Sequence, residues 1–256
     1  QKEITVDLPV NLPRIVVEGT IEQGQSPIVL LSWSQSYFTA TSISDLQNVY
    51  ISGADVKVTA NGIYYPLDEI CVSDIPLDLL PLVAEATGYS VATLLLLDIC
   101  AYTKLDNSIV GEVNTTYRLE VDYDDHHLEA TSKINSLVYL DSLWFETTGV
   151  QDSLGFAYAT LTDPDTIGNA YRWFAKRINN YPSWSALAGT QKDNFYIAPL
   201  GSTYDDEFFN GLSFEFAYYR GSGAGSNKED DYNAERGFFK VGDTIAVKGA
   251  VIDRNS

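Results

Sequence analysis

The alternation of hydrophobic and polar residues predicts a chain built mainly of short strands. Runs rich in β-branched and aromatic residues are separated by turn signals rich in Gly, Asn and Asp. Asn61 and Gly62, between two alternating runs, predict a tight hairpin. The strands expected in the first half of the chain cover residues 14–21, 27–33, 55–59, 63–67, 116–123 and 128–134. Together they predict a small antiparallel sandwich.

The same alternation of hydrophobic and polar residues begins again at Leu140 and predicts a second all-β unit. Its strands are expected over residues 141–147, 154–160, 171–178, 212–219, 238–241 and 244–252. We therefore expect a mainly β chain with two antiparallel β-sandwich domains, the first of them immunoglobulin- or transthyretin-like. The predicted boundaries are an extended tether over 1–13, a first domain over 14–137 and a second over 138–256.

One segment of the first domain departs from the strand pattern and predicts a helical insertion. It covers about residues 74–102, with helices expected over 78–87 and 90–100 and with Ser90 as an N-cap. A helix that is apolar on all sides is covered by the rest of its chain or by a partner. Two interpretations therefore stay open, packing over the sandwich edge or docking to another subunit. The side chains that would make either contact are those of Leu94, Leu95, Leu96 and Leu97.

The two cysteines of the chain, Cys71 and Cys100, bracket this insertion. Their placement predicts a disulfide, which in the chain-entropy model stabilises the fold by roughly 3.5 kcal/mol. The alternative is a pair of buried free thiols. A disulfide implies an oxidising compartment.

The charge of the chain limits the classes of molecule that it can bind. Sixteen Lys and Arg against 35 Asp and Glu give a formal charge of −19. Such a chain is repelled by phosphate backbones and has no basic patch for an anionic membrane. The most apolar stretch, residues 79–102, is interrupted by proline and charged residues, so no transmembrane helix is expected. Membrane attachment would have to come from outside the folded part.

The search for catalytic motifs predicts a protein that is not an enzyme and binds no cofactor or metal. Nucleophile-elbow, phosphate-loop and zinc-helix motifs are absent from the sequence. His126 and His127 fall in a hairpin tip expected over 124–127, which we interpret as a polar turn. Residues 205–207 offer oxygens for Ca²⁺ but lack the spacing of a calcium loop. We interpret them as a surface turn with an aromatic anchor.

The tyrosine-rich composition leaves a sugar-binding role open. Trp33, Tyr181 and Trp184 fall in loop-like or edge contexts that suit stacking on sugars, although core packing explains most aromatic residues equally well. Paired carboxylates for glycoside hydrolysis are not singled out by any pattern. A glycan-binding module or glycosidase of the cell envelope is therefore the alternative function.

Four tripeptides of the form Asp, then Ser or Thr, then an aliphatic residue resemble the O-glycosylation acceptor pattern of Bacteroidota envelope proteins. Chance supplies about one or two such matches at this composition. The simpler interpretation is a polar pair at the start of a strand. The candidate acceptors are Ser142, Ser153, Thr166 and Thr244.

Several segments, taken in order, carry a resemblance to one family. They are residues 1–9, 15–19, 27–35, 49–56, 111–119, 140–145, 169–174 and 205–211. The chain resembles the Bacteroidota outer-membrane lipoproteins known as domain of unknown function 4249. The likeness covers nearly the whole chain, and it rests on order and spacing rather than on one diagnostic motif.

The resemblance implies an envelope protein with an anchor and a partner. Members carry a lipid anchor on a Cys that here would precede Gln1, and their genes commonly neighbour TonB-dependent outer-membrane receptors. No catalytic residue is established for the family, so none is carried over. Members usually continue past the last strand predicted here, so the second domain is expected to be truncated at its C-terminus.

With the resemblance, the sequence leads us to expect a non-catalytic outer-membrane lipoprotein, lipid-anchored and facing the cell exterior, with the periplasmic face as the alternative. Its expected role is that of an accessory or substrate-capture subunit of a TonB-dependent transporter. A glycan-binding protein would instead expose a groove lined with Trp or Tyr. A purely structural envelope protein is the third possibility.

Overall fold

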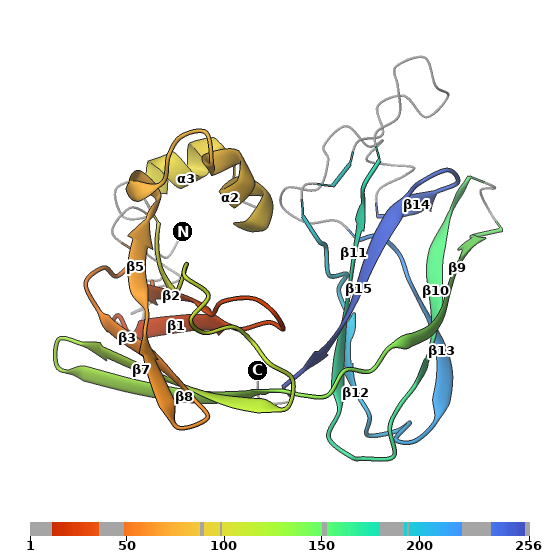
Figure 1. Ribbon diagram of the computed structural model, residues 1–256. Coiled ribbons are helices and arrows are strands. Elements are labelled where there is room, and N and C mark those ends of the chain that lie inside the picture. Colours follow the sequence, from red (N-terminus) through yellow and green to blue (C-terminus); the bar gives the residue numbers. More distant parts are fainter. Residues whose placement is uncertain are drawn as a thin grey trace, which may run out of the picture. The chain divides into compact units, whose positions relative to one another are not determined.

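The computed structural model confirms a mainly β fold of antiparallel sandwich domains (Figure 1). It divides into two compact units, residues 1–81 with 90–131, and residues 82–89 with 132–256. None of the described helices combines the length and hydrophobicity needed to cross a membrane. The structure describes residues 12–35, 49–87, 90–97, 99–149, 153–179, 192–193, 195–221 and 237–253.

The first unit contains two four-stranded antiparallel sheets. One sheet has the order β1-β2-β6-β5, with β1 Ile15–Thr20, β2 Ile28–Trp33, β6 Cys100–Thr103 and β5 Asp68–Cys71. The other has the order β4-β3-β7-β8, with β4 Ile63–Pro66, β3 Asp55–Ala60, β7 Thr115–Tyr123 and β8 His126–Ile134.

Alternating residues of these strands form the core of the first unit. Leu31 of β2, Val56 of β3 and Val121 of β7 are almost fully buried, because successive side chains of a strand point to opposite faces. The predicted β3–β4 hairpin is present. Asn61 and Gly62 both have positive φ, at 52° and 79°, which a tight turn of the I′ type requires.

The helical insertion lies between β5 and β6. It contains the 3₁₀ turn η1 Val72–Asp74 and the helices α2 Leu80–Thr87 and α3 Val91–Leu97. Ser90 is the predicted N-cap of α3, since its Oγ accepts a hydrogen bond of 3.0 Å from the Thr93 N–H. The prediction that this helix reaches Cys100 is wrong. Cys100 begins β6, where it pairs directly with Cys71 of β5.

The predicted disulfide between Cys71 and Cys100 is confirmed, with a Cα–Cα distance of 3.9 Å. It joins directly opposed residues of two neighbouring strands. The insertion therefore starts and ends at one covalent link, which limits how far its two ends can separate.

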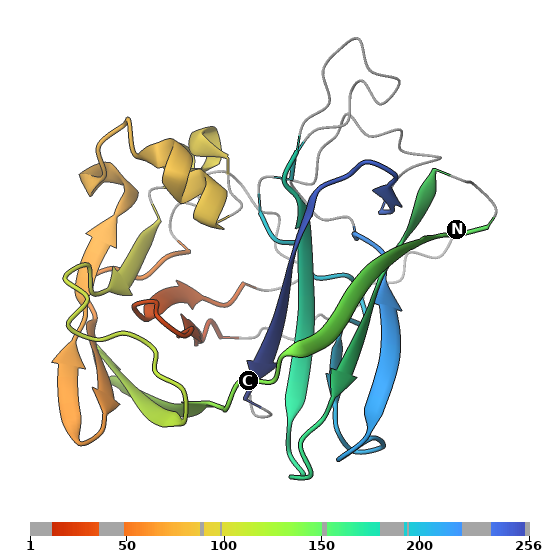
Figure 2. The ribbon, with the colours of Figure 1, turned by 45° about the vertical axis from the view of Figure 1, so that its right-hand side comes forward.

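The second unit is also built of two antiparallel sheets (Figure 2). In one, β10 Leu154–Thr162 pairs with β9 Leu140–Thr147, β13 Ser213–Tyr218 and β14 Phe239–Lys240. The other has the order β12-β11-β15, with β12 Thr203–Asp205, β11 Ala170–Arg177 and β15 Ile245–Ile252. Their buried core cluster consists of Ala157, Ala159, Trp173, Ala175 and Phe239.

The close approach of β9 to β10 depends on Gly155. A Cβ placed there would lie 2.0 Å from the Glu146 carbonyl oxygen and 2.7 Å from the Phe145 ring. Any larger residue would push β9 away from β10. This glycine therefore fixes the position of β9 and of the side chains that it displays.

Candidate functional site

The outward side of the β13-β10-β9 sheet carries a row of partly exposed aromatic rings. Trp144 of β9 and Tyr158 of β10 are cross-strand partners. Their rings stack with a centroid distance of 5.6 Å and an interplanar angle of 23°. Next along β10, Phe156 meets Phe238 edge-on at 5.5 Å. We call Trp144, Phe156, Tyr158 and Phe238 the aromatic face.

Carboxylates and hydroxyls border the aromatic face. The Trp144 Nε1–H donates a hydrogen bond of 2.8 Å to Glu146 Oε1, which fixes the orientation of the indole. Ser142 and Thr160, also cross-strand partners, share a hydrogen bond of 2.5 Å. Exposed Glu215 of β13 lies opposite Thr160. The arrangement can stack against a flat apolar surface and accept hydrogen bonds around its edge.

The two histidines lie at the start of β8 and not in the turn before it, so the predicted turn over 124–127 is too long. The turn consists of Asp124 and Asp125, and Asp124 has a φ of 48°. Aspartate tolerates this left-handed conformation. A two-residue turn therefore closes the hairpin and leaves His126 and His127 to the strand.

His127 forms the centre of an exposed charge network. Its Nδ1 lies 2.5 Å from Asp122 Oδ1, and its Nε2 lies 2.9 Å from Glu129 Oε1. Hydrogen bonds to Glu129 and Asp122 raise the pKa of His127 above its usual value. Hydrogen bonds from His127 and Arg118 lower the pKa of Glu129, and one from His127 lowers that of Asp122. The charge network comprises Lys57, Arg118, Glu120, Asp122, His127 and Glu129.

Part of this network has the ligand types of a metal site. Ligand atoms of Glu120, His127 and Glu129 lie within 4.8 Å of one another. Arg118 Nη2, however, lies 2.5 Å from Glu129 and 3.7 Å from Glu120. The guanidinium already supplies the positive charge that a metal would bring. We therefore interpret the cluster as ion pairing on an exposed strand pair.

Two loops of the second unit, residues 163–169 and 206–212, are joined by buried carboxylates. Asp206 Oδ2 accepts hydrogen bonds of 2.8 Å from the backbone N–H groups of both Gly168 and Asn169. Asp163 Oδ2 accepts one of 3.1 Å from the Gly211 N–H, and Asp163 Oδ1 accepts one from the Tyr171 hydroxyl. We call Asp163, Asp206 and these donors the aspartate clasp. It holds the two loops in a fixed arrangement.

The clasp corrects the prediction that residues 205–207 form a surface turn. Asp206 is fully buried, because its carboxylate replaces water as the partner of two backbone N–H groups. The expected aromatic anchor is Phe209, whose ring lies 4.2 Å from that of Phe214. Burial and the hydrogen bond to Asp163 raise the pKa of Tyr171.

The leucines of α3 divide between core and surface. Leu94 is 2% exposed, whereas Leu95 and Leu96 are 51% and 46% exposed. Leu94 therefore anchors the helix. The prediction that all four leucines contact a partner is wrong for Leu94, because its side chain is buried within the chain. Leu97 is partly buried. Leu77 and Leu79, just before α2, are also exposed.

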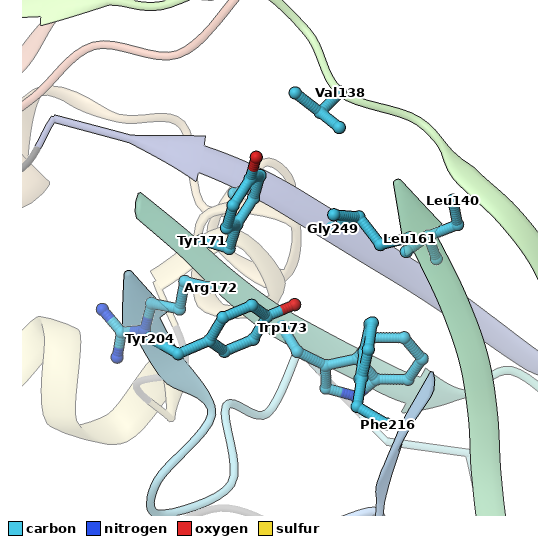
Figure 3. Close-up of a pocket in the computed structure, with 10 residues that line it drawn as sticks. Val138, Leu140, Leu161, Tyr171, Arg172, Trp173, Tyr204, Phe216 and Gly249 are labelled. Carbon is cyan, nitrogen blue, oxygen red and sulfur yellow. The ribbon is translucent and has the colours of Figure 1, made fainter. Parts of the chain in front are cut away.

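The core of the second unit encloses a small cavity between its sheets (Figure 3). Its volume of about 10 Å³ is enough for roughly one water molecule. Tyr204 and Phe216 line it, and Arg172 directs its guanidinium away from it (Figure 3). The cavity is a packing feature too small for an organic ligand. The full lining consists of Val138, Leu140, Leu161, Tyr171, Arg172, Trp173, Tyr204, Phe216, Gly249 and Ala250.

The remaining predicted site residues are placed as follows. The four candidate glycosylation acceptors, Ser142, Ser153, Thr166 and Thr244, are all solvent-exposed. Trp33 meets Tyr123 and His126 edge-on at 6.3 and 6.4 Å. Trp33 thus packs within the first unit and belongs to a different sheet from the aromatic face. Tyr181 and Trp184 lie outside the described residues, as do residues 1–11 of the predicted tether.

Comparison with known proteins identifies the family. The model of the family described as domain of unknown function DUF4249 matches residues 1–254. The chain belongs to this family. No curated protein and no solved structure matches it.

Two segments that carried the resemblance to DUF4249, residues 169–174 and 205–211, meet in the aspartate clasp. The Asp206 N–H donates a hydrogen bond of 3.1 Å to the Asn169 carbonyl, beside the bonds to its carboxylate. The family signal in this part of the chain therefore coincides with the contacts that fix two loops.

Sequence reasoning missed the aromatic face of this DUF4249 chain. The signal was available, because Ser142, Trp144 and Glu146 alternate with apolar Leu143 and Phe145 in a predicted strand. Alternation alone does not say which side faces the core. Pairing with the buried Ala159 and Ala157 of β10 places Leu143 and Phe145 on the core side of the sheet, where they remain 46% and 36% exposed.

Proposed function

We propose that this DUF4249 protein is a non-catalytic lipoprotein of the outer membrane that serves as an accessory or substrate-capture subunit of a TonB-dependent transporter. It would be lipid-anchored and face the cell exterior. The Cys71–Cys100 disulfide supports an oxidising compartment such as the cell envelope. The partner class is supported by the family resemblance.

The observation that carries the docking role is the display of leucines on the disulfide-bounded insertion. The side chains of Leu95 and Leu96 on α3 are exposed, while the side chain of Leu94 is buried and anchors the helix. Leu77, with 73% exposure, adds a further apolar side chain from the same insertion. Grouped apolar side chains on a surface are typical of protein contact sites.

Affinity purification from native outer membranes tests this proposal. The tagged full-length protein, expressed in its host and extracted in mild detergent, is expected to recover a TonB-dependent transporter. The double variant Leu95→Glu with Leu96→Glu should lose it, because buried carboxylates would be left unpaired in the interface. Failure of the wild-type protein to recover a transporter would refute the proposal.

Ile63→Glu supplies the matched control. Ile63 is 56% exposed on the β3–β4 hairpin, away from the insertion in sequence. The substitution adds one carboxylate, against two in the double variant, at a similar exposure, and it is expected to leave transporter recovery unchanged. Labelling with a radioactive fatty acid tests the anchor separately, since an anchored protein incorporates it.

A further inference from the structure

We propose that the aromatic face binds an uncharged oligosaccharide. This inference deepens the proposed capture role by naming the class of molecule that is captured, and in that sense it rests on the proposed function. The binding surface would be the outward side of β9, β10 and β13. Its centre would be the stacked pair of Trp144 and Tyr158.

The first argument is the shape of the surface. Sugar rings have flat C–H faces that pack against aromatic rings, and a partly exposed Trp beside a Tyr provides such a platform. Phe156 lies two residues from Tyr158 on β10, which places the two side chains roughly 7 Å apart along the strand. Rings spaced in this way offer successive positions for a chain of sugars instead of one site for a single sugar.

The second argument is the polar border. Glu146 Oε1 already holds the Trp144 indole, and the Ser142 and Thr160 hydroxyls and the Glu215 carboxylate lie on the same side of the sheet. Carboxylates accept hydrogen bonds from several hydroxyl groups at once. A ligand rich in hydroxyl donors satisfies this border better than an apolar peptide segment does.

The third argument is charge. Lys and Arg are absent from the described outward positions of β9, β10 and β13, whereas carboxylates are present. Such a surface repels phosphate, sulfate and uronate groups. The ligand is therefore an uncharged glycan. The outward positions are Ser142, Trp144, Glu146, Phe156, Tyr158, Thr160, Thr162, Ser213, Glu215 and Ala217.

The other sheet of the same unit shows the contrast. On its outward side the Phe174 ring is covered by cations, with Arg172 at 5.0 Å and Lys248 at 5.2 Å from its centroid. No such cation covers Trp144 or Tyr158 among the described residues. One sheet of this acidic protein thus places the outward Phe174 ring under positive charge, whereas Trp144 and Tyr158 of the other sheet stack on each other.

Affinity electrophoresis of the purified protein tests the inference. The gels contain a β-glucan, an α-glucan, a mannan, a xylan or, as the charged comparison, a polyuronate. At least one uncharged polysaccharide is expected to retard the wild-type protein, and the polyuronate is not. Trp144→Ala should weaken the binding at least tenfold, and Trp144→Phe, which keeps a stacking ring, should retain part of it.

Phe145→Ala is the matched control, because Phe145 lies on the same strand with its side chain on the opposite side of the sheet. It should bind like the wild type, and thermal melts of every variant check that each is folded. Absence of retardation by every uncharged polysaccharide, or equal retardation of wild type and folded Trp144→Ala, overturns the inference.

A protein contact at the aromatic face is the competing outcome, and it also overturns the inference. In that case Trp144→Ala would abolish recovery of the transporter while no polysaccharide retards the wild type. The gel assay uses the purified chain and the transporter assay uses native membranes. Failure of glycan binding is therefore distinguishable from failure of the proposed function.

Discussion

The aspartate clasp of the second unit and the charge network of the first place the same kind of side chain in opposite surroundings. In the clasp, Asp163 and Asp206 are buried and accept hydrogen bonds from backbone N–H groups and one tyrosine hydroxyl. In the charge network, Asp122 and Glu129 are more than 40% exposed and pair with the half-exposed His127 side chain.

The surroundings decide what each carboxylate does. A buried donor that loses its acceptor cannot recover the bond with water, so removing one partner costs the full desolvation of the other. An exposed ion pair exchanges one set of contacts for water and is screened by salt. The clasp should therefore act as a fixed structural element. The charge network should respond to pH and ionic strength.

The largest expected effect comes from Asp206→Ala. The substitution leaves the part-buried backbone N–H groups of Gly168 and Asn169 without this acceptor, and bonds to charged groups are worth about 1.5–3 kcal/mol each. We expect the free energy of unfolding to fall by roughly 3 kcal/mol, as measured by urea denaturation. Exposed Glu207→Ala, at the next position, should change it by less than about 0.5 kcal/mol. A loss at Asp206 as small as that at Glu207 would contradict the clasp.

A smaller effect is expected from Tyr171→Phe. It removes only the hydroxyl that donates to Asp163, whose other carboxylate oxygen keeps the bond from Gly211. One buried charge-assisted bond is lost, so we expect about 1.5 kcal/mol of destabilisation in the same assay. Tyr204→Phe is the control, since the contacts found for Tyr204 in the described part of the chain are ring contacts. If both variants lose the same amount, the effect comes from the ring pocket and not from the bond.

The elements that the sequence predicts well are those with a long alternating pattern. The strands expected over 171–178 and 244–252 are present as β11 and β15, within one residue at each end. The strands β5, β6 and β12 were missed, because runs of three or four residues are too short to show a period. Cys100 was assigned to a helix for the same reason, since its strand pairing depends on Cys71, 29 residues earlier.

The site residues were harder to predict than the strands, because their roles depend on distant partners. Asp206 looks like part of an acidic surface run until Gly168, 38 residues away, is seen to donate to it. Arg177 reads as the charged end of a strand, yet it is completely buried and lies 2.9 Å from Asp243. Local pattern indicates which positions alternate, but pairing of distant segments decides which polar groups are desolvated.

The smallest expected effect is a pH dependence at His127. The hydrogen bonds to Glu129 and Asp122 raise the pKa of His127 in the folded state above about 6.5, the value for the unfolded chain. The folded state therefore binds the proton more tightly. The resulting stabilisation is fully present below pH 6.5 and is lost as the pH rises through the folded-state pKa of His127. An NMR titration of the ring should give a midpoint above 6.5.

Salt and one substitution separate this effect from the clasp. In 1 M NaCl the His127 midpoint should move back towards 6.5, because both carboxylates are exposed and screened, whereas the cost of Asp206→Ala should hardly change. His127→Gln should remove the loss of stability with rising pH. A midpoint at or below 6.5, or one unaffected by salt, would show that the network does not hold the charged imidazole. The two carboxylate environments would then differ in burial alone and not in their response to the solvent.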